Sequence, residues 1–241
     1  MDTYNIIKLS HVDSTNDYAL SLRSDKIFKE GLVIVSDYQK AGKGQRGSTW
    51  ESKKGKNLTL SVVLQLDLLI NRQFDISRIV SLSIIDVLLL LGVKSTVKWP
   101  NDILVGKRKI AGILIQNIIS ANKITHSVVG IGLNVNQLSF YNYIPEATSL
   151  SLELYKKFNI EQIQDQILLS IKNRVESYRL GRGQDVEYLD MLFQKDKIID
   201  FEIKSKRFKG IIKGVTNPGL LIVEIEGQMR NFDLKEIKMI F

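Results

Sequence analysis

The chain has 241 residues, of which 44% are hydrophobic and 25% charged, a composition typical of a soluble globular protein. It contains no cysteine, which excludes structural disulfides, thiolate metal sites and cysteine nucleophiles. The formal net charge is +8, but the basic residues are spread along the sequence without a zinc-finger or RNA-binding motif, so the charge alone does not predict a nucleic-acid-binding protein.

The N-terminus lacks the basic segment and apolar stretch of a signal peptide. The most apolar window, residues 79–93, is too short to span a bilayer and is interrupted by Ser and Asp. We therefore expect a cytoplasmic protein without a membrane association. His11 and His126 are the two histidines, and isolated imidazoles favour structural roles over a metal site.

The first half of the chain alternates predicted helices and strands. Capping side chains before apolar residues predict a short helix over residues 14–22. Apolar runs predict strands over 32–36 and 57–66. A longer apolar-periodic segment predicts a core helix over 74–91 that ends at Gly92.

The middle of the chain is dominated by predicted strands. We expect a strand over 97–102 that ends in a turn, a hairpin over 103–116 and a strand over 126–135. Pro145 is expected to open a helical region, and a longer helix is predicted over 161–179.

The pattern changes again after about residue 195. Short strands separated by Gly- and Pro-containing turns are predicted over 198–204, 209–215, 220–226 and 229–233. Short strands at this density predict a small barrel. We therefore predict an α+β chain, with a mixed or mostly antiparallel sheet and helices over 1–190 and a small C-terminal β domain over 195–241.

A glycine-rich basic segment, G-K-G-Q-R-G-S-T-W at residues 42–50, follows the predicted strand 32–36. Its glycines allow the backbone to approach a ligand closely, while Lys43 and Arg46 add positive charge and Trp50 adds a stacking face. The combination suits a small anionic ligand that carries a ring, such as a nucleotide. A solvated surface turn is the alternative, and the spacing matches neither the P-loop nor the Rossmann fingerprint.

The segment K-W-P-N-D at residues 98–102 places Asn101 and Asp102 at the end of a predicted strand. With Lys98 before them and Lys109 across the hairpin, these side chains could serve a magnesium–nucleotide, since a carboxylate suits a hard cation or a proton and a lysine suits a phosphoryl oxygen. An ordinary turn is the alternative.

Glycines on two further strands predict a slot for a flat ligand. Gly112 would leave space against the strand backbone, although the charges just before it also fit a solvated turn. Gly130, Gly132 and Asn134 share one strand face at a period of two, and the apolar residues between them face a core. A β-bulge is the alternative interpretation of that strand.

Together these segments closely resemble the biotin protein ligase family, where they occur in the same order. The matching segments are Ser14-Thr15-Asn16 and residues 42–50, 98–102, 109–114 and 130–134. The K-W-P-N-D segment is the most specific of them. The resemblance covers nearly the whole chain and implies the family's catalytic fold, which is similar to that of class II synthetases, followed by an SH3-like barrel.

The resemblance implies a two-step reaction. Biotin and MgATP would give biotinyl-5′-AMP and pyrophosphate, and a lysine of a biotin carboxyl carrier domain would then attack the mixed anhydride and release AMP. ATP, biotin and Mg²⁺ are the implied ligands, with the metal carried by ATP rather than held in a protein cage. The family often dimerises, so a homodimer is among the expected assemblies.

The resemblance also implies roles for individual residues. The expected catalytic residues are Lys109, Asp102 and Lys43. The expected biotin site comprises Ser14, Thr15, Asn16, Gln39, Gly42, Lys43, Lys109, Gly112 and Gly130. The expected nucleotide site comprises Arg46, Trp50, Asn57, Lys98, Asn101 and Asn134. Lys109 would hold the carboxylate and α-phosphate, Trp50 would stack on adenine, and Asp102 would accept a proton from the acceptor lysine or orient it.

The chain departs from the family pattern in two places. Lys43, Gln45 and Ser48 stand where arginines are frequent in the glycine-rich loop, which predicts weaker retention of biotinyl-AMP. Only 13 residues precede Ser14, too few for the helix-turn-helix domain of family members that repress transcription, so we expect no DNA-binding role.

Three other functions remain to be weighed. A lipoate or octanoate ligase shares this fold, but its usual R-R-x-S-G-G-G loop and the histidine of the following strand are absent from the sequence. A non-catalytic nucleic-acid-binding protein would need a clustered basic face with interleaved aromatic residues. A protein that binds biotin without ligating it remains an alternative, although the presence of Lys109 and Asp102 argues against it.

Overall fold

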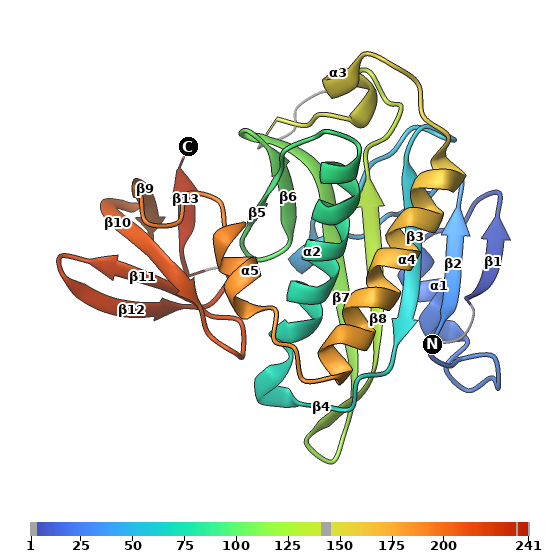
Figure 1. Cartoon of the computed structure of the whole chain (residues 1–241), viewed down its shortest axis with the longest axis horizontal. Coiled ribbons are helices and arrows are strands. Elements are labelled where there is room, and N and C mark those ends of the chain that lie inside the picture. Colours follow the sequence, from blue (N-terminus) through green and yellow to red (C-terminus); the bar gives the residue numbers. More distant parts are fainter. Residues whose placement is uncertain (1–3, 141–145, 235, 241) are drawn as a thin grey trace.

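A computed structural model describes residues 4–140, 146–234 and 236–240, with the exception of the Arg46 side chain. The backbone forms a large mixed sheet with helices and a smaller second sheet near the C-terminus (Figure 1). This arrangement confirms the predicted α+β fold class.

The larger sheet has eight strands. They are β1 (Asn5–Leu9), β2 (Leu32–Ser36), β3 (Leu58–Leu64), β4 (Leu68–Leu69), β5 (Thr96–Lys98), β6 (Asp102–Val105), β7 (Arg108–Ser120) and β8 (Lys123–Leu133). Their order is β1-β2-β3-β8-β7-β6-β5, with β4 beside β8. β1 and β2 are parallel, and the other described pairs are antiparallel, so the prediction of a mixed, mostly antiparallel sheet is confirmed.

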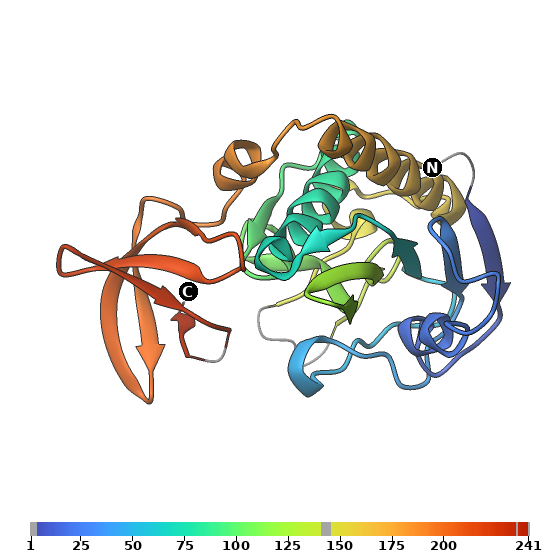
Figure 2. The ribbon, with the colours of Figure 1, turned by 90° about the horizontal axis from the view of Figure 1, so that it is seen from below.

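Helices cover both faces of this sheet. α2 (Phe74–Leu90) and α4 (Ile160–Arg179) pack against each other on one face, while α1 (Thr15–Ser21) contacts β2, β3 and β8 from the other (Figure 2). The glycine-rich loop, residues 42–50, lies on the same side as α1. That side therefore holds most of the segments that the sequence analysis marked as functional.

The three predicted helices that lie within the described residues are confirmed. α1 begins after Ser14, whose hydroxyl accepts a hydrogen bond from the backbone N–H of Asp17 at 3.3 Å. α2 ends just before Gly92, which adopts a φ of +86° that favours glycine. α4 begins after Asn159, whose side-chain oxygen accepts from the N–H groups of Glu161 and Gln162.

The remaining described helical segments are short. They are α3 (Leu150–Leu154), α5 (Asp185–Asp190) and two 3₁₀ turns, η1 (Gln45–Gly47) and η2 (Ile70–Arg72). The predicted helical start at Pro145 lies outside the described residues. α5 was not predicted because its short polar sequence carries little helical periodicity.

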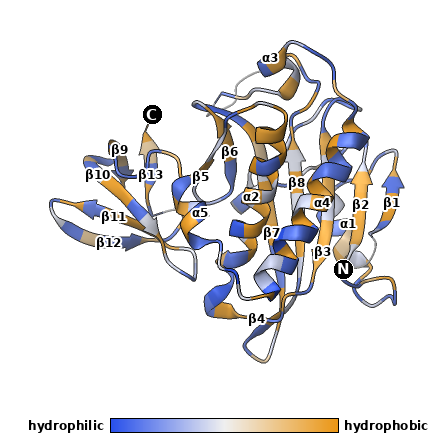
Figure 3. Cartoon of the chain, in the orientation of Figure 1, coloured by the Kyte–Doolittle hydropathy of each residue, from blue (hydrophilic) through white to orange (hydrophobic). Residues whose placement is uncertain are grey.

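Burial explains the difference in character between the two long helices. α2 packs against the sheet, α4 and α5, and most of its side chains are buried, which accounts for its nearly continuous apolar sequence. α4 alternates hydrophobic and hydrophilic residues because one of its sides faces solvent (Figure 3). The central strands β2 and β3 are mostly hydrophobic, as expected for strands covered on both faces.

Five short strands form the second sheet. They are β9 (Ile198–Ile203), β10 (Lys206–Val215), β11 (Leu221–Ile225), β12 (Gln228–Phe232) and β13 (Lys238–Ile240), in the order β12-β11-β10-β9-β13. The four predicted strands are confirmed, and β13 is additional. The predicted barrel requires correction: the three-residue β13 pairs with β9, no described pairing joins it to β12, and the sheet stays open.

The two sheets share a continuous core. The segment Met191–Phe193 runs beside β5, where Val97 N–H donates to the Met191 carbonyl at 2.8 Å and Phe193 N–H donates to the Val97 carbonyl at 2.8 Å. Buried side chains of both sheets belong to one hydrophobic cluster. The division into domains at 190 and 195 stays a prediction. None of the helices among the described residues is long and apolar enough to cross a membrane.

Candidate active site

A cavity of about 290 Å³ opens on the α1 side of the larger sheet. Its walls come from the start of α1, the glycine-rich loop, the β5–β6 turn and strands β7 and β8. The predicted site residues that line it are Ser14, Thr15, Asn16, Gln39, Lys43, Trp50, Asn101, Asp102, Lys109, Gly112, Gly130 and Asn134. Segments more than 100 residues apart in the sequence therefore meet at one cavity, as the predicted site requires.

One wall of the cavity is a network of hydrogen-bonded polar side chains. The backbone N–H and the hydroxyl of Thr15 donate to Gln39 Oε1 at 2.8 and 3.1 Å. The hydroxyl of Ser61 lies 2.7 Å from Thr15 Oγ1 and 2.6 Å from Asn16 Oδ1. Asn16 Nδ2 donates to Gln116 Oε1 at 2.8 Å. These mutual contacts hold the polar groups in fixed orientations, as recognition of a polar ligand needs.

This network contains two residues that the sequence analysis missed, Ser61 and Gln116. Ser61 lies in the middle of the apolar strand β3 and is fully buried. The available signal was that Ser61 and Thr59, two residues apart, place polar side chains on the same face of an apolar strand. That pattern also fits an ordinary strand. Gln116 belongs to the predicted hairpin and carried no signal of its own.

The floor of the cavity consists of strand backbone left bare by glycines. A Cβ on Gly130 would overlap the Asn16 amide, and one on Gly132 would overlap the Trp50 ring. A Cβ on Gly112 would lie 3.2 Å from both Lys109 and the Trp50 ring. The glycines are therefore required by the close approach of these side chains, which occupy the strand face themselves. Binding of a flat ligand on this face stays a prediction.

Trp50 lies flat against this floor. Its indole N–H is buried and has no hydrogen-bond partner among the described residues. Lys109 Nζ lies 5.6 Å from the ring centre, within the range of a cation–π interaction. The ring thus provides an aromatic surface inside the cavity.

A carboxylate between two lysines provides the charge at the site. Lys109 Nζ lies 2.6 Å from Asp102 Oδ1, and Lys98 Nζ lies 3.5 Å from Asp102 Oδ2. The Asp102 side chain is 13% exposed, so this charge cluster is largely shielded from solvent. Next to it, Asn101 Nδ2 donates to the Ile113 carbonyl at 2.8 Å, which fixes the turn against β7.

The glycine-rich loop folds back on itself at the mouth of the cavity. Gly44 N–H donates to the Ser48 carbonyl at 2.7 Å, and Trp50 N–H donates to the Gly42 carbonyl at 2.9 Å. Lys43 Nζ lies 2.7 Å from Asp17 Oδ2, which ties the loop to α1. The loop is therefore held by backbone hydrogen bonds between its two ends and by one exposed ion pair to α1.

Three predicted residues whose side chains are described are not part of the cavity lining. Gly42 faces a second hollow on the other side of the loop, together with Tyr38 and Lys53. Asn57 is buried, accepts from Val135 N–H at 3.0 Å and donates to Gln137 Oε1 at 2.7 Å, so it braces the segment after β8.

Lys98 contacts the cavity indirectly, through Asp102. The Arg46 side chain lies outside the described part of the structure. Within the described residues, no group of three or more His, Asp or Glu side chains is arranged to hold a metal ion.

Comparison with known proteins identifies the family. Residues 9–134 match the model of the biotin/lipoate A/B protein ligase family. The chain is 32% identical over 181 residues to the biotin--[acetyl-CoA-carboxylase] ligase of Mycobacterium tuberculosis, a match that covers 73% of this chain and 66% of that protein. It is 25% identical over 234 residues to the bifunctional ligase/repressor BirA of Bacillus spizizenii, covering 95% of this chain and 72% of the relative.

The fold agrees with a solved structure of this family. The biotin protein ligase from Aquifex aeolicus in complex with biotin and ATP superposes with a TM-score of 0.78 and 21% identity, covering 98% of each chain. At that identity the likeness shows the fold alone. Because the family model spans more than half of the sequence, including the cavity-lining segments from α1 to β8, the protein belongs to the biotin/lipoate A/B protein ligase family and is a ligase.

Proposed function

We propose that this protein is an ATP-dependent biotin protein ligase that transfers biotin to a lysine of a biotin carboxyl carrier domain. The observation that carries the proposal is one cavity that joins a fixed polar wall, a glycine floor beneath an aromatic ring, and the Lys109–Asp102 pair. The M. tuberculosis relative is named for biotin and for acetyl-CoA carboxylase, which supports this choice within the family.

In the first step, a carboxylate oxygen of biotin attacks the α-phosphorus of ATP, and pyrophosphate leaves with the electrons of the broken P–O bond. The polar wall, with Ser14, Thr15 and Gln39, would bind the ureido group of biotin. Lys109 would stabilise the negative charge that grows on the α-phosphate. Mg²⁺ enters with ATP as part of the substrate.

In the same step, the nucleotide would lie over the glycine floor. Trp50 would stack on adenine, and Asn134 would supply polar contacts near it. The Asn134 amide already donates to the Thr148 carbonyl at 3.0 Å, which fixes its orientation at the cavity. Lys43 would contact the carboxylate or the acyl phosphate.

In the second step, the neutral Nζ of the acceptor lysine attacks the acyl carbon, and AMP leaves with the electrons of the C–O bond. A lysine in water is mostly protonated, so it must lose a proton before it attacks. Asp102 would accept that proton or orient the amine, since its carboxylate lines the cavity.

The remaining assignments follow from this proposal. Residues 1–190 would carry both steps, and residues 195–241 would form a separate C-terminal β domain. The acceptor is a carrier domain of a biotin-dependent carboxylase. A homodimer and a cytoplasmic location stay predictions.

The decisive experiment is carboxylic-acid-dependent exchange of pyrophosphate into ATP in the presence of Mg²⁺, with biotin, lipoate and octanoate tested in parallel. We expect exchange with biotin and none with the other two acids. Exchange with lipoate or octanoate alone would assign the chain to the other branch of its family. Folded protein that exchanges with no acid would contradict an adenylating function.

A further inference from the structure

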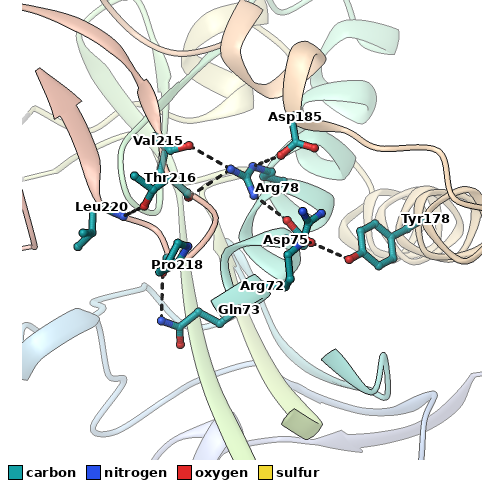
Figure 4. Close-up of polar contacts among 10 residues, drawn as sticks. All are labelled: Arg72, Gln73, Asp75, Arg78, Tyr178, Asp185, Val215, Thr216, Pro218 and Leu220. Atoms are coloured by element: carbon teal, nitrogen blue, oxygen red, sulfur yellow. Dashed lines mark hydrogen bonds and ion pairs between the residues drawn. The ribbon is translucent and has the colours of Figure 1, made fainter. Parts of the chain in front are cut away.

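The turn between β10 and β11 (residues 216–220), together with Val215 at the end of β10, is held by side chains of α2 and of residues next to the larger sheet. Arg78 Nη2 donates to the carbonyls of Val215 at 3.2 Å and Thr216 at 3.3 Å, and Gln73 Nε2 donates to the Pro218 carbonyl at 3.0 Å (Figure 4). Both donors come from α2 or the residue before it. The turn therefore meets α2 through its backbone carbonyls.

A third donor comes from the K-W-P-N-D segment. The indole N–H of Trp99 donates to the Gly219 carbonyl at 2.9 Å, across 120 residues of sequence. Trp99 is 4% exposed and Gly219 is half-buried, so this hydrogen bond is partly shielded from water. The second sheet thus binds directly to the segment that carries Lys98 and Asp102.

Gly219 is fitted tightly to this position. Its φ is +110°, and a Cβ on it would lie 2.8 Å from the Phe74 ring. The turn is also braced internally, because Gly219 N–H donates to the Thr216 carbonyl at 3.0 Å and Leu220 N–H donates to Thr216 Oγ1 at 2.9 Å. These contacts hold the Gly219 carbonyl in position to accept the hydrogen bond from Trp99.

The α2 side of the contact is equally fixed. Arg78 is buried and pairs with Asp75 at 2.6 Å and with Asp185 at 3.2 Å (Figure 4). Asp75 also accepts from Tyr178 at 2.6 Å and Arg72 at 2.7 Å. This network ties α2, α4 and α5 together where the turn docks, which gives the turn a rigid base.

We propose that Trp99 is a positioning residue for the ligase reaction, and that the β10–β11 turn acts through it to hold Lys98 and Asp102 at the cavity. The contact falls one residue from Lys98 and three residues from Asp102, whose carboxylate lies 2.6 Å from Lys109. Between β5 and β6, the Asn101 carbonyl also accepts a hydrogen bond from Ile113 N–H of β7 at 3.0 Å. The segment is therefore held from both ends, by β7 and by the second sheet.

The expected effect of Trp99 on the rate of biotin transfer depends on the proposed function. A shift of the segment would move the group assigned to the acceptor lysine, while the polar wall that binds biotin shares no residue with it. We therefore expect loss of the Trp99 contact to slow transfer from preformed biotinyl-AMP without changing the affinity for biotin.

Three variants test the proposal. Trp99→Phe keeps an aromatic side chain, although a smaller one, and removes the N–H donor. Gly219→Ala displaces the acceptor by collision with Phe74. Gln73→Ala is the matched control, because it removes a hydrogen bond to the same turn without touching Trp99. We expect the first two variants to slow transfer about fivefold, the effect of losing one hydrogen bond, with the control near wild type.

Hydrogen exchange of the amides in residues 98–102 provides a readout that needs no substrate. We expect Trp99→Phe and Gly219→Ala to speed this exchange about fivefold and Gln73→Ala to leave it unchanged. Wild-type exchange in Trp99→Phe, or equal effects in all three variants, would overturn the positioning role. Failure of the wild type to activate biotin would overturn the proposed function instead. The hydrogen-exchange rates of residues 98–102 would still show whether Trp99 positions this segment.

Discussion

The Lys109 ammonium lies 2.6 Å from a carboxylate oxygen of Asp102, in a cluster largely shielded from solvent. The two residues are close because β6 begins at Asp102, and its antiparallel neighbour β7 places Lys109 opposite Leu104, two residues further along β6. The pair combines a cation suited to phosphoryl oxygens with a carboxylate suited to a proton, at the edge of the cavity. Removing the Lys109 charge should therefore reduce the rate of the reaction without unfolding the protein.

Lys109→Gln should reduce biotin-dependent pyrophosphate exchange about 100- to 1,000-fold, because it removes the positive charge proposed to stabilise the α-phosphate as pyrophosphate departs. The measurement is the exchange rate at saturating ATP and biotin. Lys107→Gln, in the exposed turn of the same hairpin, is the matched control and should retain wild-type exchange. Equal activity in the two variants would remove Lys109 from the reaction.

Gly132→Ala should raise the KM for ATP about tenfold, because the added methyl group overlaps the Trp50 ring and forces it off the floor. The affinity for biotin should change less, since the polar wall is unaffected. Gly214→Ala is a suitable control, because its Cβ would meet no atom closer than 3.4 Å. An unchanged KM for ATP in Gly132→Ala would argue against a nucleotide at this surface.

Gln45→Arg should lengthen the residence of biotinyl-AMP about fivefold to tenfold. The loop carries Gln45 at the cavity lining, and an arginine there could form charge-assisted hydrogen bonds with a phosphate. The measurement is the half-life of the adenylate on the enzyme without acceptor. Gln228→Arg makes the same charge change on the exposed strand β12 and should leave the half-life unchanged.

The sequence predicted this site well where the signal was local. Three segments with local patterns meet at the cavity: the glycine-rich loop, the K-W-P-N-D segment and the strand with Gly130 and Gly132. The glycines are informative because few other residues fit where side chains approach the backbone this closely. Contacts between distant segments were not predictable. Neither Ser61 beside Asn16 nor the Gly219 carbonyl that accepts from Trp99 has a local pattern that names its partner.

The fold shows the same limit. Elements with strong periodicity, such as α2 and β2, were predicted to within a residue. β1 was missed because it is a half-exposed edge strand, and its parallel pairing with β2 depends on tertiary context. The barrel was wrong because closure depends on how the short strand β13 pairs, which its own sequence does not specify.

Asp75→Asn should destabilise the protein by about 3 kcal/mol, because it leaves the buried Arg78 guanidinium without its closest carboxylate. Asp75 is 2% exposed and also accepts from Tyr178 and Arg72, so several hydrogen bonds weaken together. The measurement is the free energy of unfolding in urea. Asp190→Asn, at an exposed position on α5, is the control and should cost little.

Burial and the hydrogen bond to Asp75 raise the pKa of Tyr178 from 10.0 to about 12. Because the folded state holds this proton more tightly than the unfolded state, the stability it contributes is complete below pH 10 and is lost as the pH rises toward 12. Tyr178→Phe should therefore weaken the alkaline loss of stability, measured as the urea midpoint on either side of pH 10. An identical pH dependence in the variant would contradict this assignment.

The most direct test of the account is whether the purified chain makes biotinyl-5′-AMP. The protein is mixed with biotin, Mg²⁺ and ATP labelled at the α-phosphate, without an acceptor, and the protein-bound product is identified by mass spectrometry. The account predicts biotinyl-5′-AMP in an amount near one per chain in the wild type and a large loss in Lys109→Gln. Folded wild-type protein that binds biotin and ATP but forms no adenylate, or forms one with lipoate only, would contradict the account.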